Sequence, residues 1–207
     1  VDILGLDIEL LALVPQPVLA CMLLFPITRA TERLRITEEA KLKADPAEVP
    51  ASIKNVFFQV QEIENACGTI GCIHSICNSA DVELVPGSFF DRLKKGEVTL
   101  NAARQTMSGD ATDGVEELGE AHAKVAAKGQ SKVPHAGELI NLHFVSFARV
   151  GDTLWELDGR RAGPVPRKTP CTHDSLLYDV AEHVKGIISA TDEVRFNLLA
   201  LIKSQQQ

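Results

Sequence analysis

The stretch from Val18 to Phe25 is apolar at every position and is followed directly by Pro26. A short continuous apolar run that ends at a helix breaker is typical of a strand buried on both faces of its sheet. The chain has 207 residues, of which 45% are hydrophobic. A chain of this length can bury such a strand in a sizeable core without a disulfide framework. We therefore expect a single domain over residues 1–207.

Two further runs, Leu142–Val150 and Thr153–Leu157, alternate in hydrophobicity and are joined by Gly151 and Asp152. Alternation of this kind on both sides of a two-residue turn predicts a β-hairpin. The remaining segments complete an α/β pattern. We expect strands at Asn55–Val60 and Glu193–Ile202, helices at Asn65–Cys77, Val115–Lys128 and Asp174–Ile187, a charged surface segment at Thr28–Glu48, a turn at Met107–Gly114 and an extended loop at Arg161–Pro170.

The formal net charge is −7 and the pI is about 5.4. A protein that binds nucleic acid through phosphate contacts would carry a basic face, so we expect no nucleic-acid partner. The most apolar region, Leu10–Phe25, is interrupted by Pro15 and Pro17 and is too short to cross a bilayer. We therefore expect no membrane partner either.

The five cysteines stand at positions 21, 67, 72, 77 and 171, and no two of them form a CxxC pair. This spacing does not predict a zinc site, and we expect neither a metal nor another cofactor. Free thiols are typical of proteins in the reducing cytoplasm or nucleus. We interpret Cys21 as a core residue, Cys72 and Cys77 as buried structural residues within a helix, and Cys171 as an exposed residue of a polar loop.

Cys67 lies in the first turn of the helix predicted for Asn65–Cys77, with Asn65 as its N-cap. A helix N-terminus presents unpaired N–H groups and a partial positive charge, which stabilise a thiolate. Gly68 leaves little bulk beside the sulfur. Free cysteines are more often buried structural residues than nucleophiles, so position alone leaves both interpretations open.

A nucleophilic cysteine needs a base, and the base needs an orienting group. In the predicted hairpin register, His143 and Asp158 are diagonal neighbours on one face, with about 7–8 Å between their backbones. Glu156 shares that face but lies one step further from the imidazole. The alternative is a strand histidine that happens to lie beside an unrelated acid. Together with Cys67, these residues predict a catalytic triad.

A tetrahedral intermediate also needs donors aimed at its developing negative charge. The backbone N–H of Cys67 is one candidate. Gln61, at the end of the segment that leads into the helix, offers an amide donor, and Gln59 competes with it. Spacing alone does not separate the two glutamines.

The other histidines have simpler interpretations. His74 lies on the nucleophile helix and is expected to be a packed side chain rather than a second base. We expect Trp155 to pack beneath the hairpin. Surface positions are predicted for His122, His135, His173 and His183.

These motifs resemble those of the ubiquitin carboxyl-terminal hydrolases. Gln61–Gly71 reads QEIENACGTIG, which is similar to the family signature Q-x-x-x-N-A-C-G-T-I-G. Leu154–Arg160 reads LWELDGR where the family reads L-Y-E-L-D-G-R, and the step of fifteen residues from His143 to Asp158 is also the family's. Further matches run along nearly the whole chain, at Val14-Pro15, Leu23–Ile27 and Val194–Asn197.

The resemblance implies a papain-like α/β/α sandwich. Its central sheet would be mostly antiparallel and flanked by helices, in a knotted topology. The resemblance further implies Cys67 as nucleophile, His143 as general base and then acid, Asp158 as its orienter and Gln61 as the oxyanion-hole residue. A crossover loop would arch over the site, here from about Ala126 to Gly137.

The implied substrate is ubiquitin joined through its C-terminal glycine to a small or unfolded leaving group. Ubiquitin's tail is basic, which suits an acidic enzyme. The implied protein is a monomer with its substrate-binding residues at Asp2, Asn65, Leu142, Glu193 and Val194.

Two alternatives remain: a protein that sequesters free ubiquitin with little catalysis, and a hydrolase for a ubiquitin-like modifier. Family members normally have a further segment before the position of Val1, so we expect a leading segment to be missing here. The chain otherwise resembles the short, stand-alone members.

Overall fold

The computed structural model describes residues 1–45, 49–62, 65–100, 112–126 and 141–203. Its centre is a six-stranded sheet with the order β1-β8-β2-β5-β6-β7, in which every neighbouring pair is antiparallel. The strands are β1 (Asp2–Ile3), β2 (Val18–Pro26), β5 (Leu142–Val150), β6 (Thr153–Leu157), β7 (Val165–Lys168) and β8 (Asn197–Ile202). Two short strands, β3 (Val98–Thr99) and β4 (Thr112–Asp113), form a separate parallel pair.

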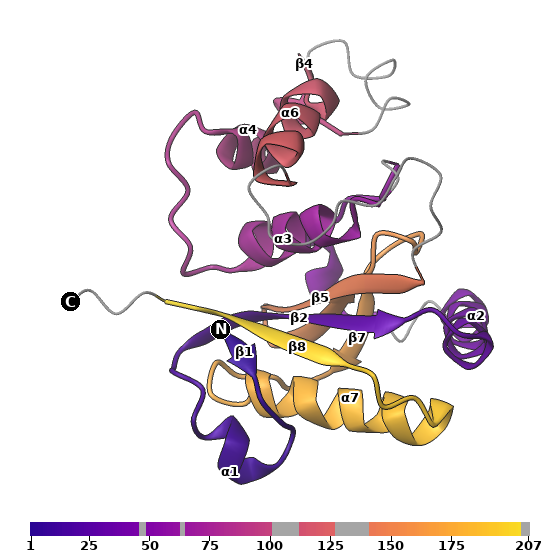
Figure 1. Cartoon of the computed structure of the whole chain (residues 1–207). Helices are drawn as coiled ribbons and strands as arrows, with labels where there is room; N and C mark the ends of the chain where they lie inside the picture. Colours follow the sequence, from indigo (N-terminus) through magenta and orange to yellow (C-terminus); the bar gives the residue numbers. More distant parts are fainter. Residues whose placement is uncertain (46–48, 63–64, 101–111, 127–140, 204–207) are drawn as a thin grey trace.

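Helices cover both faces of this sheet (Figure 1). Helix α3 packs against β2 and β5 on one face, with α4 and α6 beyond it, and α7 lies across the opposite face with α1. Helix α2 lies at one end of the sheet and contacts α7. The helices are α1 (Ile8–Leu11), α2 (Arg29–Ala44), α3 (Cys67–Asn78), α4 (Phe89–Lys95), α6 (Val115–Ala126) and α7 (Leu176–Thr191), with a 3₁₀ turn at Ala51–Asn55. The predicted α/β sandwich with an antiparallel sheet is confirmed, whereas the knotted topology stays a prediction.

The buried strand predicted at Val18–Phe25 is β2, which lies between β8 and β5. Cys21 pairs with Phe147 on one side and Ala200 on the other, and Cys21 and Phe147 are completely inaccessible to solvent. A strand with neighbours on both edges and helices on both faces has no solvated side, which explains its uniformly apolar sequence.

The hairpin is also confirmed, in the predicted register. Val150 pairs with Thr153 and Phe147 pairs with Glu156. Gly151 has φ +66°, a left-handed conformation that glycine adopts without steric cost.

The strand predicted at Asn55–Val60 is wrong. Most of this segment follows the 3₁₀ turn as extended chain that pairs with no described strand. Its N–H groups bond to side chains of α3 instead: Phe57 N–H donates to Asn78 Oδ1 (2.8 Å) and Gln59 N–H to His74 Nε2 (3.0 Å). The β-rich composition therefore reflects extended backbone whose hydrogen bonds are satisfied by a helix.

Other boundaries differ from the predictions. Within Arg161–Pro170, expected to be a loop, β7 pairs with β6 as an edge strand, a position that tolerates Pro166. The final helix ends four residues later than predicted, at Thr191, and the last strand begins at Asn197. The charged segment after Thr28 is helix α2, which Thr28 and Thr31 cap reciprocally. Most of the turn predicted at Met107–Gly114 lies outside the described residues, while Thr112–Asp113 forms β4.

Candidate active site

Cys67 is the first residue of helix α3, and its side chain is half-buried. The N-cap is Ala66, which makes no side-chain capping bond, so the prediction of Asn65 as N-cap is wrong. Asn65 instead has φ +56°, a left-handed conformation that asparagine tolerates better than most residues. The helix N-terminus places a partial positive charge beside the Cys67 sulfur.

His143, at the start of β5, bonds to Asp158, which follows β6 directly. The distance from His143 Nε2 to Asp158 Oδ1 is 2.6 Å, and both residues are at least 97% buried. The imidazole and the Phe25 ring form a T-shaped pair, with 5.9 Å between ring centroids. Because Nε2 is bound to Asp158, Nδ1 is the ring nitrogen that remains for Cys67. The structure therefore places His143, the predicted base, in contact with Asp158, the residue predicted to orient it.

The environment favours a charged pair between Cys67 and His143. Burial raises the pKa of the Cys67 thiol, but hydrogen bonds from His143 and from the Phe144 backbone outweigh it and bring the pKa below its ordinary value of 9.0. For His143, burial lowers the pKa, but the bonds to Asp158 and Cys67 outweigh it and raise the pKa to about 9. Each partner is therefore stabilised in its charged form, as thiolate and imidazolium.

Gln61 lies beside the Asp158 turn because its backbone N–H donates to the carbonyl of Gly159 (2.8 Å). A Cβ atom on Gly159 would lie 2.9 Å from Cβ of Gln61, so the approach requires glycine. The competing residue, Gln59, is buried, and its amide donates to the carbonyl of Val60 (2.8 Å). This bond takes one of the two amide N–H groups of Gln59 and holds its side chain against its own backbone, which favours Gln61 for an oxyanion role.

The predicted substrate-binding residues lie at three places. Leu142 and Asn65 are exposed and flank His143 and Cys67 in sequence. Glu193 and Val194 precede β8 at the sheet end that holds His143, since Phe25 pairs with His143 and stacks on Phe196 (6.4 Å). Val194 is 75% exposed, whereas Glu193 is ion-paired with Arg195 (2.7 Å). Asp2 is exposed on β1 opposite Leu199, further along the sheet. The predicted crossover loop lies almost wholly outside the described residues.

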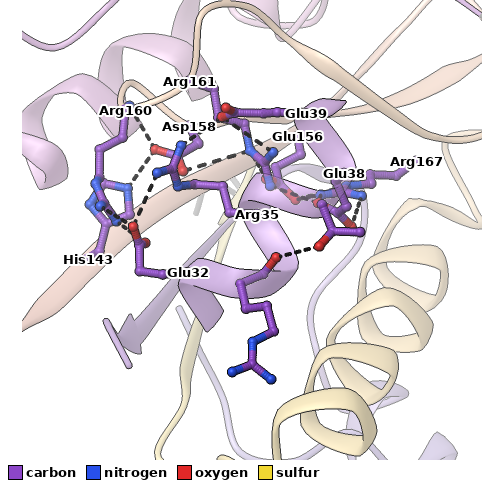
Figure 2. Close-up of polar contacts among 12 residues, drawn as sticks. Glu32, Arg35, Glu38, Glu39, His143, Glu156, Asp158, Arg160, Arg161 and Arg167 are labelled. Carbon is purple, nitrogen blue, oxygen red and sulfur yellow. Dashed lines mark hydrogen bonds and ion pairs between the residues drawn. The ribbon is translucent and has the colours of Figure 1, made fainter. Parts of the chain in front are cut away.

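Sequence reasoning missed a network of ion pairs that joins α2 to the turn after β6 and to β7 (Figure 2). Arg161 and Arg167 both bind Glu156 and Glu38, and Arg160 binds Glu32. The available signal was the inward-facing Glu156, because a buried carboxylate needs a cationic partner.

Two cysteine predictions and one histidine prediction are wrong. Cys171 is 2% exposed rather than on the surface, and burial raises the pKa of its thiol to about 11. Cys72 is exposed rather than buried, although its Sγ lies 3.9 Å from Sδ of Met22 on β2. His183 is only partly exposed and lies 3.3 Å from Glu156. Cys21 and Cys77 are buried as expected, and so is Trp155.

His74 is confirmed as a packed side chain. It is fully buried, accepts from Gln59 N–H and contacts the Leu157 carbonyl (3.2 Å). His173 is on the surface as predicted, while the side chains of His122 and His135 lie outside the described parts of the chain. Among the described residues, no group of three His, Cys, Asp or Glu side chains could hold a metal ion, and no helix is long and apolar enough to cross a membrane.

Comparison with known proteins identifies the family. The model of ubiquitin carboxyl-terminal hydrolase, family 1, matches residues 1–189. Ubiquitin carboxyl-terminal hydrolase 3 of Arabidopsis thaliana is 36% identical over 98% of this chain and 82% of its own length. Isozyme L1 of Rattus norvegicus is 34% identical over 98% of this chain and 86% of its own.

Among solved structures, the catalytic domain of Trichinella spiralis UCH37 bound to ubiquitin vinyl methyl ester has the same fold. It superposes with a TM-score of 0.65 and 23% sequence identity, covering 98% of this chain and 84% of that one. The chain belongs to family 1 of the ubiquitin carboxyl-terminal hydrolases, which are cysteine-type deubiquitinases.

Proposed function

We propose that this protein hydrolyses the bond between the C-terminal glycine of ubiquitin and a small or unfolded leaving group, through an acyl-enzyme on Cys67. The observation that carries the proposal is the 2.6 Å bond between His143 and Asp158, together with pKa values that favour a thiolate and an imidazolium. A related enzyme was captured with ubiquitin vinyl methyl ester, which supports ubiquitin as the partner.

In the first half of the reaction, the Cys67 thiolate attacks the carbonyl carbon of the terminal glycine. The developing oxyanion accepts from the amide of Gln61 and from the backbone N–H of Cys67. His143 donates its proton to the leaving amine as the carbon–nitrogen bond breaks, which leaves a thioester on Cys67.

In the second half, neutral His143 takes a proton from water, and the resulting hydroxide attacks the thioester. The carbon–sulfur bond breaks, and Cys67 regains its thiolate beside the imidazolium. The C-terminal carboxylic acid of ubiquitin departs and releases its proton to solvent, where the amine product takes one up. Asp158 keeps Nε2 of the imidazole bonded throughout, so that Nδ1 faces the reacting groups.

The test is Cys67→Ala assayed with a fluorogenic amide of ubiquitin, with Cys72→Ala as the matched control on the same helix. We expect Cys67→Ala to lose turnover and keep ubiquitin binding, and Cys72→Ala to stay active because its exposed thiol lies outside the triad. A Cys67→Ala protein that still cleaved the amide would overturn the assignment.

An electrophilic ubiquitin probe separates the hydrolase from a sequestering protein. We expect a covalent adduct on Cys67, located by mass spectrometry. Measurable ubiquitin affinity without an adduct would favour sequestration, and faster turnover of a matched ubiquitin-like substrate would favour the modifier hydrolase.

A further inference from the structure

Arg161 is a buried arginine beside the acid of the proposed triad. Its side chain is only 5% exposed, and its Nε lies 3.9 Å from Asp158 Oδ2, the oxygen that does not bind His143. The Arg161 backbone N–H also donates to the Asp158 carbonyl (2.9 Å). Arg161 therefore contacts the Asp158 turn through both its backbone and its side chain, although the reaction described above gives it no role.

The guanidinium of Arg161 is fixed by carboxylates from two other elements. Nε donates to Glu156 on β6 (3.0 Å), and Nη2 donates to Glu38 on α2 (2.8 Å), which is 123 residues away in sequence. A planar guanidinium with several charged partners has little freedom to rotate. The turn that carries Asp158 is thus anchored to helix α2 (Figure 2).

Within the described part of the chain, Arg161 borders two hollows. One of about 240 Å³ lies between the C-terminal half of α2 and residues 162–165, away from Asp158. The cavity that Asp158 itself lines measures about 40 Å³, which accommodates water rather than an organic ligand. This argues for a positioning network rather than a binding site. The charged and titratable side chains around the turn come from every element packed against it: Glu32, Arg35, Glu38 and Glu39 on α2, Cys67 and His74 on α3, His143 on β5, Glu156 on β6, Arg160 and Arg161 on the turn, Arg167 on β7 and His183 on α7.

We infer that Arg161, held in place by Glu38 of helix α2, is a positioning residue that keeps Asp158 aligned with His143. The inference rests on the proposed function, because it takes Asp158 as the orienter of the imidazole. If Arg161 acted only on stability, or only through its charge, its variants would show different pH profiles from those that positioning predicts. Variants of Arg161 and Arg167 separate these roles.

Arg167 is the matched control. It binds the same two carboxylates, Glu38 (2.8 Å) and Glu156 (2.6 Å), and is nearly as buried, but it lies on β7 outside the Asp158 turn. Arg161→Met and Arg167→Met should both lower stability, because each leaves buried carboxylates short of a partner. Only Arg161→Met should disturb Cys67 and His143.

Two quantities are measured against pH in a Cys72→Ser background, which removes the exposed thiol: kcat/KM for the fluorogenic substrate, and the rate of Cys67 alkylation by iodoacetamide. For Arg161→Met we expect the acid limb of the kcat/KM profile to move up and its alkaline limb to move down, each by about one pH unit. Both limbs move toward the centre of the profile because a misaligned Asp158 stabilises the His143 imidazolium less. The Cys67 thiolate then loses its cationic partner. With the fluorogenic substrate, kcat should fall by about 10- to 100-fold with little change in KM.

Loss of the Arg161 charge alone would act in the opposite direction. Without that cation the site is more negative, so the imidazolium would persist to higher pH and the alkaline limb would move up. Arg161→Lys keeps the positive charge but lacks the planar guanidinium. It should therefore narrow the pH profile of kcat/KM as Arg161→Met does. An alkaline limb that moves up, or a profile identical to that of Arg167→Met, would overturn the inference.

Glu38→Gln covers the case in which the Arg161 variants do not fold. It keeps the side-chain length at a partly exposed position on α2, and we expect a smaller narrowing in the same direction. An unchanged pH profile in folded Glu38→Gln would mean that α2 does not help to position Arg161. If instead the parent protein alkylated with the single midpoint of an ordinary thiol, about 8.5, the thiolate–imidazolium pair of the proposed function would fail, independently of Arg161.

Discussion

The backbone N–H of Gln61 donates to the carbonyl of Gly159 over 2.8 Å, and this bond joins the segment before α3 to the turn after β6. The two residues approach so closely because Gly159 has no side chain: a Cβ atom there would lie 2.9 Å from Gln61 Cβ and 3.0 Å from Ile70 Cγ2. The proposed oxyanion residue and the triad acid are therefore positioned by one contact.

Gly159→Ala should separate these two segments. We expect a loss of about 1–3 kcal/mol in the free energy of unfolding, as for other overpacked sites, and a lower kcat because Gln61 moves. Urea unfolding and the fluorogenic assay measure the two effects. Gly163→Ala is the control, since nothing lies within 4 Å of its Cβ position. Parent-like stability and turnover in Gly159→Ala would contradict the prediction.

Gln61→Ala should lower kcat by about 10²–10³-fold, the usual cost of removing one oxyanion donor. Gln59→Ala should have a much smaller effect on kcat, because the Gln59 amide is bonded to the Val60 carbonyl. Steady-state assays of both variants, with circular dichroism to check folding, make the comparison. A decrease of less than about tenfold in Gln61→Ala would exclude it as the oxyanion donor.

The activity should depend on pH through Cys67 and His143. The thiolate forms as pH rises through the lowered Cys67 pKa, and activity is lost as pH rises through the His143 pKa of about 9. We therefore expect a bell-shaped profile of kcat/KM with its alkaline limb near that value.

Asp158→Asn tests whether the Asp158 carboxylate sets the alkaline limb of the kcat/KM profile. Without the carboxylate, the His143 pKa should fall toward its ordinary value of 6.5, and the alkaline limb should move down by about one pH unit or more. Asp152→Asn, at the exposed hairpin turn, is the control for loss of a carboxylate. An unmoved limb in Asp158→Asn would mean that Asp158 does not stabilise the imidazolium.

His74 should make the fold sensitive to acid. Burial lowers its pKa from 6.5 to about 4, so the unfolded chain binds this proton more readily than the folded protein does. The contribution to stability is complete above pH 6.5 and decreases as pH falls toward 4, by about 2 kcal/mol at pH 5. Urea unfolding at pH 7.5 and pH 5 should show a steeper loss in the parent than in His74→Gln, which cannot titrate. Equal losses would contradict the prediction.

The local patterns of the sequence predicted much of the fold and the site. The alternation in Leu142–Val150 and Thr153–Leu157, with Gly151 between them, fixed the hairpin register and so placed His143 near Asp158. Cys67 was predicted in the first turn of a helix, although the capping role of Asn65 was not confirmed. Such features depend on periods of two or 3.6 residues and on turn chemistry, which neighbouring residues encode.

The remaining features depend on contacts between distant residues. The extended segment at Phe57 and Gln59 is no strand because Asn78 and His74 of α3 accept its N–H groups. The anchoring of the Asp158 turn needs Glu38 of α2, and no pattern within either segment encodes that pairing. Local patterns were therefore enough to predict which residues could perform the chemistry and how the hairpin aligns two of them. How α3 and α2 meet the hairpin and the turn after it could be read only from the folded chain, because packing, rather than local periodicity, selects which distant polar groups satisfy one another.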